Sequence, residues 1–338
     1  MKKVVGITFE AMNTTINVQV ITQSERVEKL KSYLNLLPTW FAGVEAVLSR
    51  FDPQSELTRI NTGVDGTYYV SNILAEVIYL ALNAVKVTNG IFDPMILGDL
   101  EQAGYDRTFQ EVMARTETGL SVLAKENVQK ARCGRMVQSN KVDKTIEIDR
   151  PTGRLVKLNG IGLDLGGIAK GWAVDRIFDQ LRHLSEQAEI CVNAGGDLRL
   201  VNPSERKPWF IKVENPLEKD ENLLSLRLNY GAVATSNVLK RRWKHEGQWQ
   251  HHLIDPRTGS PSQSTVVAAT VVADTAVEAE VWAKTICILG MEKGLELLHR
   301  RTNSGALLLS SEGELIINEK MRGAIDVGIS GPTFSIRF

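Results

Sequence analysis

The sequence is poor in the residues that usually mark a disulfide scaffold, a zinc site or a membrane segment. Its 338 residues include three cysteines, Cys133, Cys191 and Cys287, and five histidines. The odd number of cysteines and the absence of a C-x-x-C spacing indicate neither a disulfide framework nor a zinc site. No run of about 18 apolar residues occurs, so we expect no transmembrane segment.

The chain also lacks an excess of charge of either sign. Lys and Arg together number 40, as do Asp and Glu, so nothing favours a nucleic-acid partner. The two lysines near the start precede an apolar stretch that is too short for a signal peptide and ends at Glu10. We therefore expect a cytoplasmic protein. Hydrophobic residues make up 43%, enough for a globular core, and we expect a single domain over residues 1–338 that has room for two lobes.

Several nucleotide and hydrolase motifs are missing. The segment Gly160–Leu165 is not G-x-G-x-x-G, because its sixth residue is leucine, and the sequence contains no P-loop, H-E-x-x-H or G-x-S-x-G. A Rossmann fingerprint, a zinc hydrolase and a nucleophile elbow are therefore not indicated.

The most informative stretch is Gly160–Asp175, GIGLDLGGIAKGWAVD, in which a glycine pair precedes an amphipathic helical pattern. A glycine turn before a helix directs backbone N–H groups toward an anion. Lys170 lies in the predicted first turn, where the helix dipole disfavours a cation, and a negative ligand would explain it. A buried glycine turn with a solvated lysine remains an equal alternative.

Strand and helix patterns are mixed along the chain. Residues 14–22 alternate as a half-buried strand, and residues 71–89 and 276–289 have helical apolar spacing. Residues 110–129 look helical, and Pro38 is expected to interrupt the first long helix. Many consecutive strands late in the chain favour an α+β fold with antiparallel or mixed sheets and flanking helices over a doubly wound parallel sheet.

One histidine is a candidate general base. His252 precedes Asp255 by three residues in a polar loop between predicted strands. An imidazole there can accept a proton near neutral pH. A loop histidine without a chemical role remains the alternative on this pattern alone.

Seven motifs in one order resemble the signature set of the ApbE family. They are LSRFDPQSELTRIN, GIFDPMI, AGYDRTF, LDLGGIAKGWAVD, NAGGDLRL, ATSN and HLIDPRTGSP. Each motif alone is weak, whereas all seven in this order are specific. The resemblance covers roughly residues 10–300.

The resemblance implies an ApbE-like fold with an FAD site in a cleft between lobes. It also implies an FAD:protein FMN transferase. Such an enzyme cleaves FAD, attaches FMN by a phosphoester bond to a Thr or Ser of an acceptor flavoprotein, and releases AMP. Magnesium is the usual metal of the family. The alternative is an FAD-binding relative that stores or senses flavin without cleaving it.

The motifs also carry site residues onto this sequence. His252 or Asp255 would take the proton of the acceptor hydroxyl, Lys170 would neutralise phosphoryl charge, and Asp164 would hold a metal or a ribose hydroxyl. The positions expected to line the FAD site are Met12, Phe51, Ile91, Phe92, Asp93, Asp164, Lys170 and Ile254.

Two departures from the family pattern affect these expectations. Family members usually read M-G-T, whereas Asn13 follows Met12 here, and asparagine tolerates a positive φ better than most residues. At the metal positions, expected at Gly167, Glu280 and Lys284, Glu280 replaces an aspartate and Lys284 a threonine. Glu280 and Lys284 are four residues apart on the predicted helix and would form an ion pair there, or the Lys284 ammonium takes the place of the magnesium ion. Such a protein either binds FAD without magnesium or has lost transfer.

Overall fold

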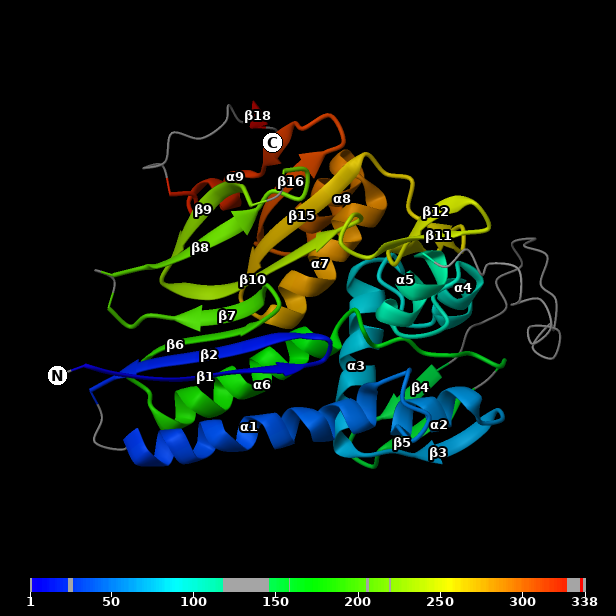
Figure 1. Ribbon diagram of the computed structural model, residues 1–338, viewed down its shortest axis with the longest axis horizontal. Helices are drawn as coiled ribbons and strands as arrows, with labels where there is room; N and C mark the ends of the chain where they lie inside the picture. Colours follow the sequence, from blue (N-terminus) through cyan, green and yellow to red (C-terminus); the bar gives the residue numbers. More distant parts are fainter. Residues whose placement is uncertain are drawn as a thin grey trace.

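A nine-stranded sheet organises the computed structural model, which describes residues 2–23, 27–117, 146–157, 159–204, 207–218, 220–326 and 335–336 (Figure 1). Its neighbouring strands are antiparallel except for the last two. In spatial order the strands are β1 (Lys3–Ala11), β2 (Thr14–Thr22), β6 (Glu189–Ala194), β7 (Asp197–Val201), β10 (Tyr230–Asn237), β15 (Val266–Ala273), β16 (Gly305–Ser310), β17 (Leu315–Ile317) and β18 (Ser335–Ile336).

The side chains of this sheet alternate between two cores. On β10, Ala232 and Ala234 belong to the larger core and Val233 to the smaller one, as a period of two requires. The larger core lies between the sheet and three long helices, α1 (Val27–Leu48), α6 (Ala169–Leu184) and α7 (Ala276–Leu289). The smaller core lies under β8 (Trp209–Glu214), β9 (Asn222–Leu228) and α9 (Glu319–Arg322), and α8 (Met291–Arg301) packs against α7.

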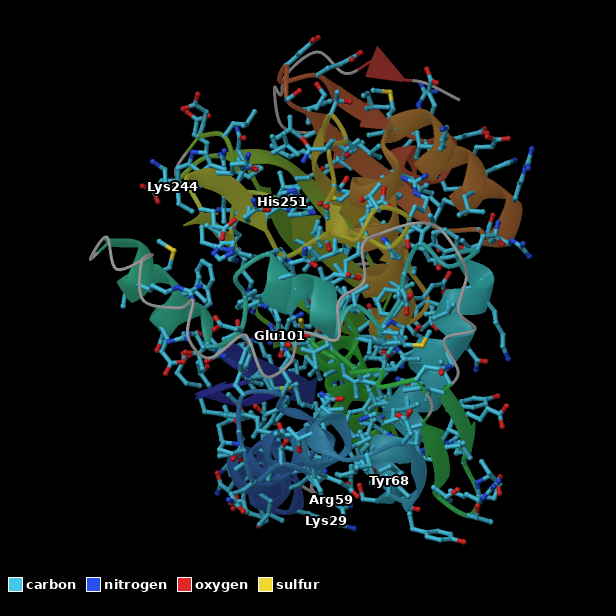
Figure 2. The ribbon with its side chains drawn as sticks, turned by 90° about the vertical axis from the view of Figure 1, so that its right-hand side faces the viewer. Lys29, Arg59, Tyr68, Glu101, Lys244 and His251 are labelled. Carbon is cyan, nitrogen blue, oxygen red and sulfur yellow. The ribbon has the colours of Figure 1, made fainter. Side chains whose placement is uncertain are left out.

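The remaining elements gather beside one end of the sheet, at the right of Figure 1. They are α2 (Glu56–Thr62), β3 (Gly66–Tyr69), α3 (Asn72–Val87), α4 (Leu97–Gln102), α5 (Phe109–Glu117), β4 (Ile146–Asp149), β5 (Arg154–Lys157), β11 (Arg242–His245), β12 (Gln248–His251), β13 (Ile254–Asp255) and β14 (Ser260–Pro261). In Figure 2, Glu101 of α4 lies between Lys244 and His251 of the β11–β12 hairpin and Arg59 and Tyr68 at the opposite end.

Most predicted elements are confirmed. The strand over residues 14–22 and the helix over residues 276–289 have the expected ends, and Ser71 caps α3 by accepting a hydrogen bond from Leu74 N. The α+β class with antiparallel sheets is confirmed. Of the helix expected over residues 110–129, α5 accounts for the part up to Glu117, and the rest lies outside the described residues. The single domain over residues 1–338 stays a prediction.

The expected interruption at Pro38 is wrong. Helix α1 runs continuously through Pro38 because its apolar stripe, which includes Leu34, Leu37 and Phe41, continues past the proline. Pro38 itself is exposed, so its ring faces water and the lost backbone hydrogen bond is outweighed by burial of the stripe. None of the described helices is long and apolar enough to cross a membrane.

Candidate functional site

The β1–β2 turn places the first expected FAD contact. Ala11 pairs with Thr14, so Met12 and Asn13 form a two-residue hairpin turn, with φ angles of 52° and 55°. Both central residues of a type I′ turn have positive φ, and asparagine is one of the residues that tolerate this. Met12 N donates to Glu45 Oε1 at 2.9 Å, which ties the turn to α1. Asn13 therefore takes the left-handed conformation that a glycine would take.

Asp164 brings three of the N-terminal motifs together. Its backbone N–H donates to Pro94 O at 2.8 Å, and its carboxylate forms an ion pair with Arg50. The Arg50 guanidinium lies 4.1 Å from the ring centre of Phe51 and 4.6 Å from that of Tyr105. Asp164 is thus paired with a protein cation beside an aromatic surface. The sequence analysis did not single out Arg50, although it precedes Phe51 directly.

The Ile91–Asp93 turn lies against the glycine turn that precedes α6. A methyl group added at Gly167 would lie 3.2 Å from the Phe92 ring and 3.4 Å from Cε of Lys284. Ile91 and Phe92 are buried, and the Asp93 carboxylate accepts a backbone N–H within its own turn. Gly167 therefore keeps open a narrow space between an aromatic ring and the Lys284 side chain.

Four charged side chains meet where α6, α7 and β7 come together. Lys170 forms ion pairs with Asp197 and with Oε1 of Glu280, the latter at 2.8 Å. The same oxygen accepts from Lys284 Nζ at 3.0 Å, and Oε2 accepts from Gly171 N at 2.9 Å. Two carboxylates and two ammonium groups thus share one buried cluster.

A second set of contacts holds α6 and α7 in this relation. The Asp175 carboxylate, on α6, accepts from Ala276 N at 2.9 Å and Val277 N at 3.0 Å, the first amides of α7. Arg199 forms an ion pair with the same carboxylate. A methyl group at Gly171 would lie 2.9 Å from the Ala276 carbonyl carbon, so glycine allows the close approach of the two helices.

The pKa shifts favour the charged forms of Lys170 and Glu280, whereas burial raises the pKa of Asp197. Burial lowers the pKa of Lys170, but Asp197 and Glu280 outweigh this effect and raise the pKa above its usual value. Burial raises the pKa of Glu280, but Lys170, Lys284 and the Gly171 N–H lower it below its usual value. Gly171 lies in the first turn of α6, so the helix dipole also favours the Glu280 carboxylate.

The negative partners of Lys170 in the structure are therefore protein carboxylates. The expected contact of Lys170 with phosphate stays a prediction. The sequence analysis gave Asp197 no role in the site, although an acid that follows a glycine pair and opens a buried strand is unusual.

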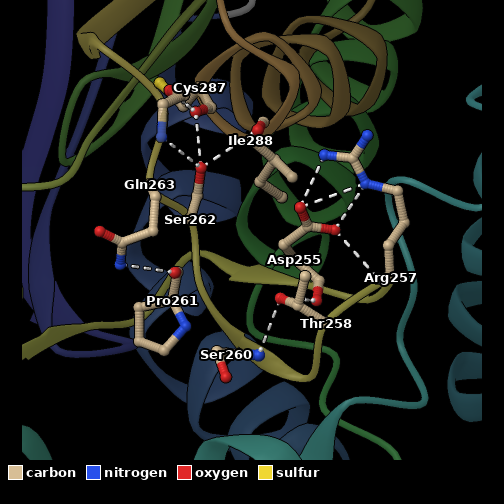
Figure 3. Close-up of polar contacts among 10 residues, drawn as sticks. Asp255, Arg257, Thr258, Ser260, Pro261, Ser262, Gln263, Cys287 and Ile288 are labelled. Atoms are coloured by element: carbon tan, nitrogen blue, oxygen red, sulfur yellow. Dashed lines mark hydrogen bonds and ion pairs between the residues drawn. The ribbon is translucent and has the colours of Figure 1, made fainter.

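The loop that carries His252 and Asp255 is fastened to the end of α7 (Figure 3). Burial raises the pKa of Asp255, but the hydrogen bonds from Arg257, at 2.6 Å and 2.8 Å, outweigh this and lower it below its usual value. Ser262 Oγ donates to the carbonyl oxygens of Cys287 and Ile288 at 3.3 Å and 3.1 Å. Asp255 therefore shapes the loop.

His252 is a neutral imidazole with a free nitrogen. Burial, Arg241 and Lys284 lower its pKa well below its usual value. One ring nitrogen bonds the Arg241 backbone, and Nδ1 is buried without a hydrogen-bond partner among the described residues. Ile254, two residues later, packs in a buried cluster with Tyr105. Ile254 thus joins the histidine loop to the aromatic surface.

The residues at the expected metal positions do not fit a magnesium ion. Magnesium requires several oxygen ligands in near-octahedral geometry. Both carboxylate oxygens of Glu280 are occupied by N–H donors, and two ammonium groups lie against one of them. Within the part of the chain that the structure describes, no group of three or more His, Cys, Asp or Glu side chains is placed to hold a metal.

These features define an α+β protein in which a glycine turn and a helix start adjoin a buried cluster of two carboxylates and two ammonium groups. The chain belongs to the ApbE family, because the model of that family matches residues 12–308.

Individual relatives agree with this assignment. The FAD:protein FMN transferase of Haemophilus influenzae is 26% identical over 321 residues, which cover 93% of this chain and 89% of the relative. One from Klebsiella pneumoniae is 30% identical over 164 residues, about half of each chain at 48% and 50%. The ApbE protein of Thermotoga maritima shares the fold, with a TM-score of 0.77, 24% identity, and coverage of 96% of this chain and 100% of that one.

Proposed function

We propose that this chain is an FAD:protein FMN transferase, which attaches FMN to a Thr or Ser of an acceptor flavoprotein. Membership of the ApbE family and the relatives of that name support the proposal. The observation that carries it in this chain is the buried His252 imidazole, whose Nδ1 has no hydrogen-bond partner among the described residues and whose pKa is lowered by burial, Arg241 and Lys284. A neutral imidazole with a free nitrogen suits a general base in the transfer of a phosphoryl group to a hydroxyl.

The proposed step transfers FMN from FAD to the hydroxyl of the acceptor. The acceptor hydroxyl oxygen attacks the phosphorus on the FMN side of the FAD pyrophosphate, and the bond from that phosphorus to the bridging oxygen breaks. AMP leaves with the bridging oxygen and its electron pair. The hydroxyl proton passes to Nδ1 of His252, which is neutral and can accept it once the loop admits the acceptor.

We propose that the expected FAD contacts line the flavin nucleotide site. Two aromatic surfaces support this: the Phe92 ring beside Gly167, and the Phe51 ring under the Arg50 guanidinium. The full proposed set is Met12, Phe51, Ile91, Phe92, Asp93, Asp164 and Ile254. Within it, Asp164 is proposed to orient the nucleotide through Arg50, its ion-pair partner.

Two other expected roles are reassigned in the proposal. Lys170 is proposed to be a positioning residue, because its ammonium lies on Asp197 and Glu280. Asp255 is proposed to hold the histidine loop, because its carboxylate accepts from Arg257. His252 is then the base, and Asp255 is not.

The test is transfer itself. The purified protein is incubated with FAD and an acceptor flavoprotein domain, and covalent flavin is read by in-gel fluorescence and intact mass. We expect an adduct of the mass of FMN, and we expect His252→Ala to abolish it while FAD binding remains. The Haemophilus influenzae relative serves as the positive control for the acceptor. Bound, intact FAD without an adduct would favour a flavin-storing or flavin-sensing protein instead.

We also propose that the protein acts in the cytoplasm. Cys191 and Cys287 are buried free thiols, as expected of a chain that folds in a reducing compartment. Cell fractionation with an antibody against the chain tests this, and recovery in a periplasmic or membrane fraction would contradict it.

A further inference from the structure

The Lys284 ammonium has donors to spare at the edge of the charge cluster. The side chains of Lys284 and Lys170 are 14% and 18% exposed, whereas that of Glu280 is completely buried. An ammonium has three N–H donors, and Glu280 Oε1 accepts one of them at 3.0 Å. The other two have no hydrogen-bond partner among the described residues. Lys284 is therefore held on one side by a carboxylate and free to donate on the other.

The open side of Lys284 faces the parts of the site that would hold the pyrophosphate. Its Cδ and Cε lie beside Gly167, in the turn before α6, with the Phe92 ring on the other side of that glycine. Its charge also contributes to the lowered pKa of His252, after burial and Arg241. The Lys284 side chain thus lies beside the glycine turn that precedes α6.

The charge balance of the cluster leaves no need for a further cation. The two carboxylates, Asp197 and Glu280, are balanced by the two ammonium groups of Lys170 and Lys284. A divalent ion would add two positive charges beside two ammonium groups, and it would have to displace N–H donors from Glu280. The cluster therefore needs no divalent ion to hold its two carboxylates.

Resting on the proposed function, we infer that the Lys284 ammonium binds the FAD pyrophosphate in place of a divalent metal ion, so that FAD binding needs no magnesium. Lys284 then donates to phosphoryl oxygens and stabilises the charge that develops on the departing AMP. Lys170 and Gly171 hold Glu280, and Glu280 in turn holds Lys284 in place.

The experiment measures FAD affinity by quenching of flavin fluorescence, with excess EDTA and with excess magnesium. We expect the unaltered protein to bind FAD with the same affinity, within about twofold, in both conditions. We expect Lys284→Met to weaken binding by roughly tenfold or more in both, because one desolvated charge contact to phosphate is lost. The matched control is Lys293→Met on α8, an exposed lysine, which should leave affinity unchanged.

In a variant that restores the metal ligands, FAD affinity should depend on magnesium, unlike that of the unaltered protein. In Glu280→Asp with Lys284→Thr, the ammonium is removed and oxygen ligands are supplied, so FAD binding should weaken in EDTA and recover with magnesium. Isothermal titration with magnesium alone and with FAD present reports metal binding directly. Circular dichroism of each variant shows that it is folded.

Failure of this inference is distinguishable from failure of the proposed function. Loss of FAD binding by the unaltered protein in EDTA, or unchanged affinity in Lys284→Met, would overturn the inference even if FMN transfer occurs. Metal-independent, Lys284-dependent FAD binding without any transfer to the acceptor would leave the binding role of Lys284 standing and overturn the transferase proposal.

Discussion

Removing the Glu280 charge tests the buried cluster most directly. In Glu280→Gln, the ammonium groups of Lys170 and Lys284 share the single carboxylate of Asp197, so the cluster carries an uncompensated positive charge. Breaking a buried ion pair by removing one partner costs about 3–5 kcal/mol of unfolding free energy. Glu280 is completely buried and accepts from three donors, so we expect Glu280→Gln to fall within this range.

A second substitution should recover part of the loss. Lys284→Met added to Glu280→Gln restores neutrality, because Lys170 and Asp197 remain as a pair. We therefore expect the double variant to be more stable than Glu280→Gln alone by about 1–2 kcal/mol, although it carries one more substitution. Lys284→Met alone should cost less than Glu280→Gln, because Lys284 is partly exposed and Glu280 keeps the Lys170 and Gly171 donors.

The assay is urea unfolding of the four proteins, followed by far-UV circular dichroism, with the slope compared between variants to verify that each unfolds in the same way. Two outcomes would refute the reasoning. A cost below about 1 kcal/mol for Glu280→Gln would mean that the cluster is solvated rather than buried. A double variant whose cost equals the sum of the single costs would mean that Glu280 and Lys284 do not interact.

Three further predictions concern pH, the first helix and the first turn. The unfolded chain protonates His252 near pH 6.5 while the folded chain keeps it neutral, so stability should fall between about pH 7 and pH 5, by at most about 1.4 kcal/mol per pH unit. His252→Asn should reduce this slope, as urea midpoints at the two pH values will report, and an unchanged slope would contradict the assignment. Pro38→Ala should raise the unfolding free energy by about 1–3 kcal/mol, because α1 is continuous and Pro38 is exposed. An unchanged or lower urea midpoint would contradict this prediction. Asn13→Ala should lower the unfolding free energy by about 1 kcal/mol and Asn13→Gly by much less, because φ is 55° at this position. Equal thermal midpoints for the two variants would argue against backbone strain at residue 13.

Local patterns predicted the elements well, because their causes are local. Alternation over residues 14–22 and the stop at Gly290 after residues 276–289 are set by neighbours in sequence. Pro38 misled the prediction because a local penalty was outweighed by burial of a whole helix stripe, which only the packed structure reveals.

The site was predictable only in part, for the opposite reason. The pairing of Glu280 with Lys284 could be expected, because i and i+4 are neighbours on a helix. The contacts of Lys170 with Asp197 and of Arg50 with Asp164 join residues far apart in the sequence, and no periodicity reports such pairs. The motifs predicted that Lys170 and Asp164 belong to a site, but their ion-pair partners are evident only in the folded structure.

Two sets of carboxylate–amide hydrogen bonds hold α6 against α7, and this affects which ligands the proposed site can accept. Asp175 holds the start of α7, Glu280 holds the start of α6, and Gly171 lets the two helices touch, so the pair behaves as one rigid block. The spacing of the turn at Gly167 and the α7 backbone at Lys284 is then set by buried carboxylates that accept from helix amides. If the proposed pyrophosphate site is correct, this frame would favour a diphosphate linkage over one with one phosphate more or fewer, because the spacing cannot adjust.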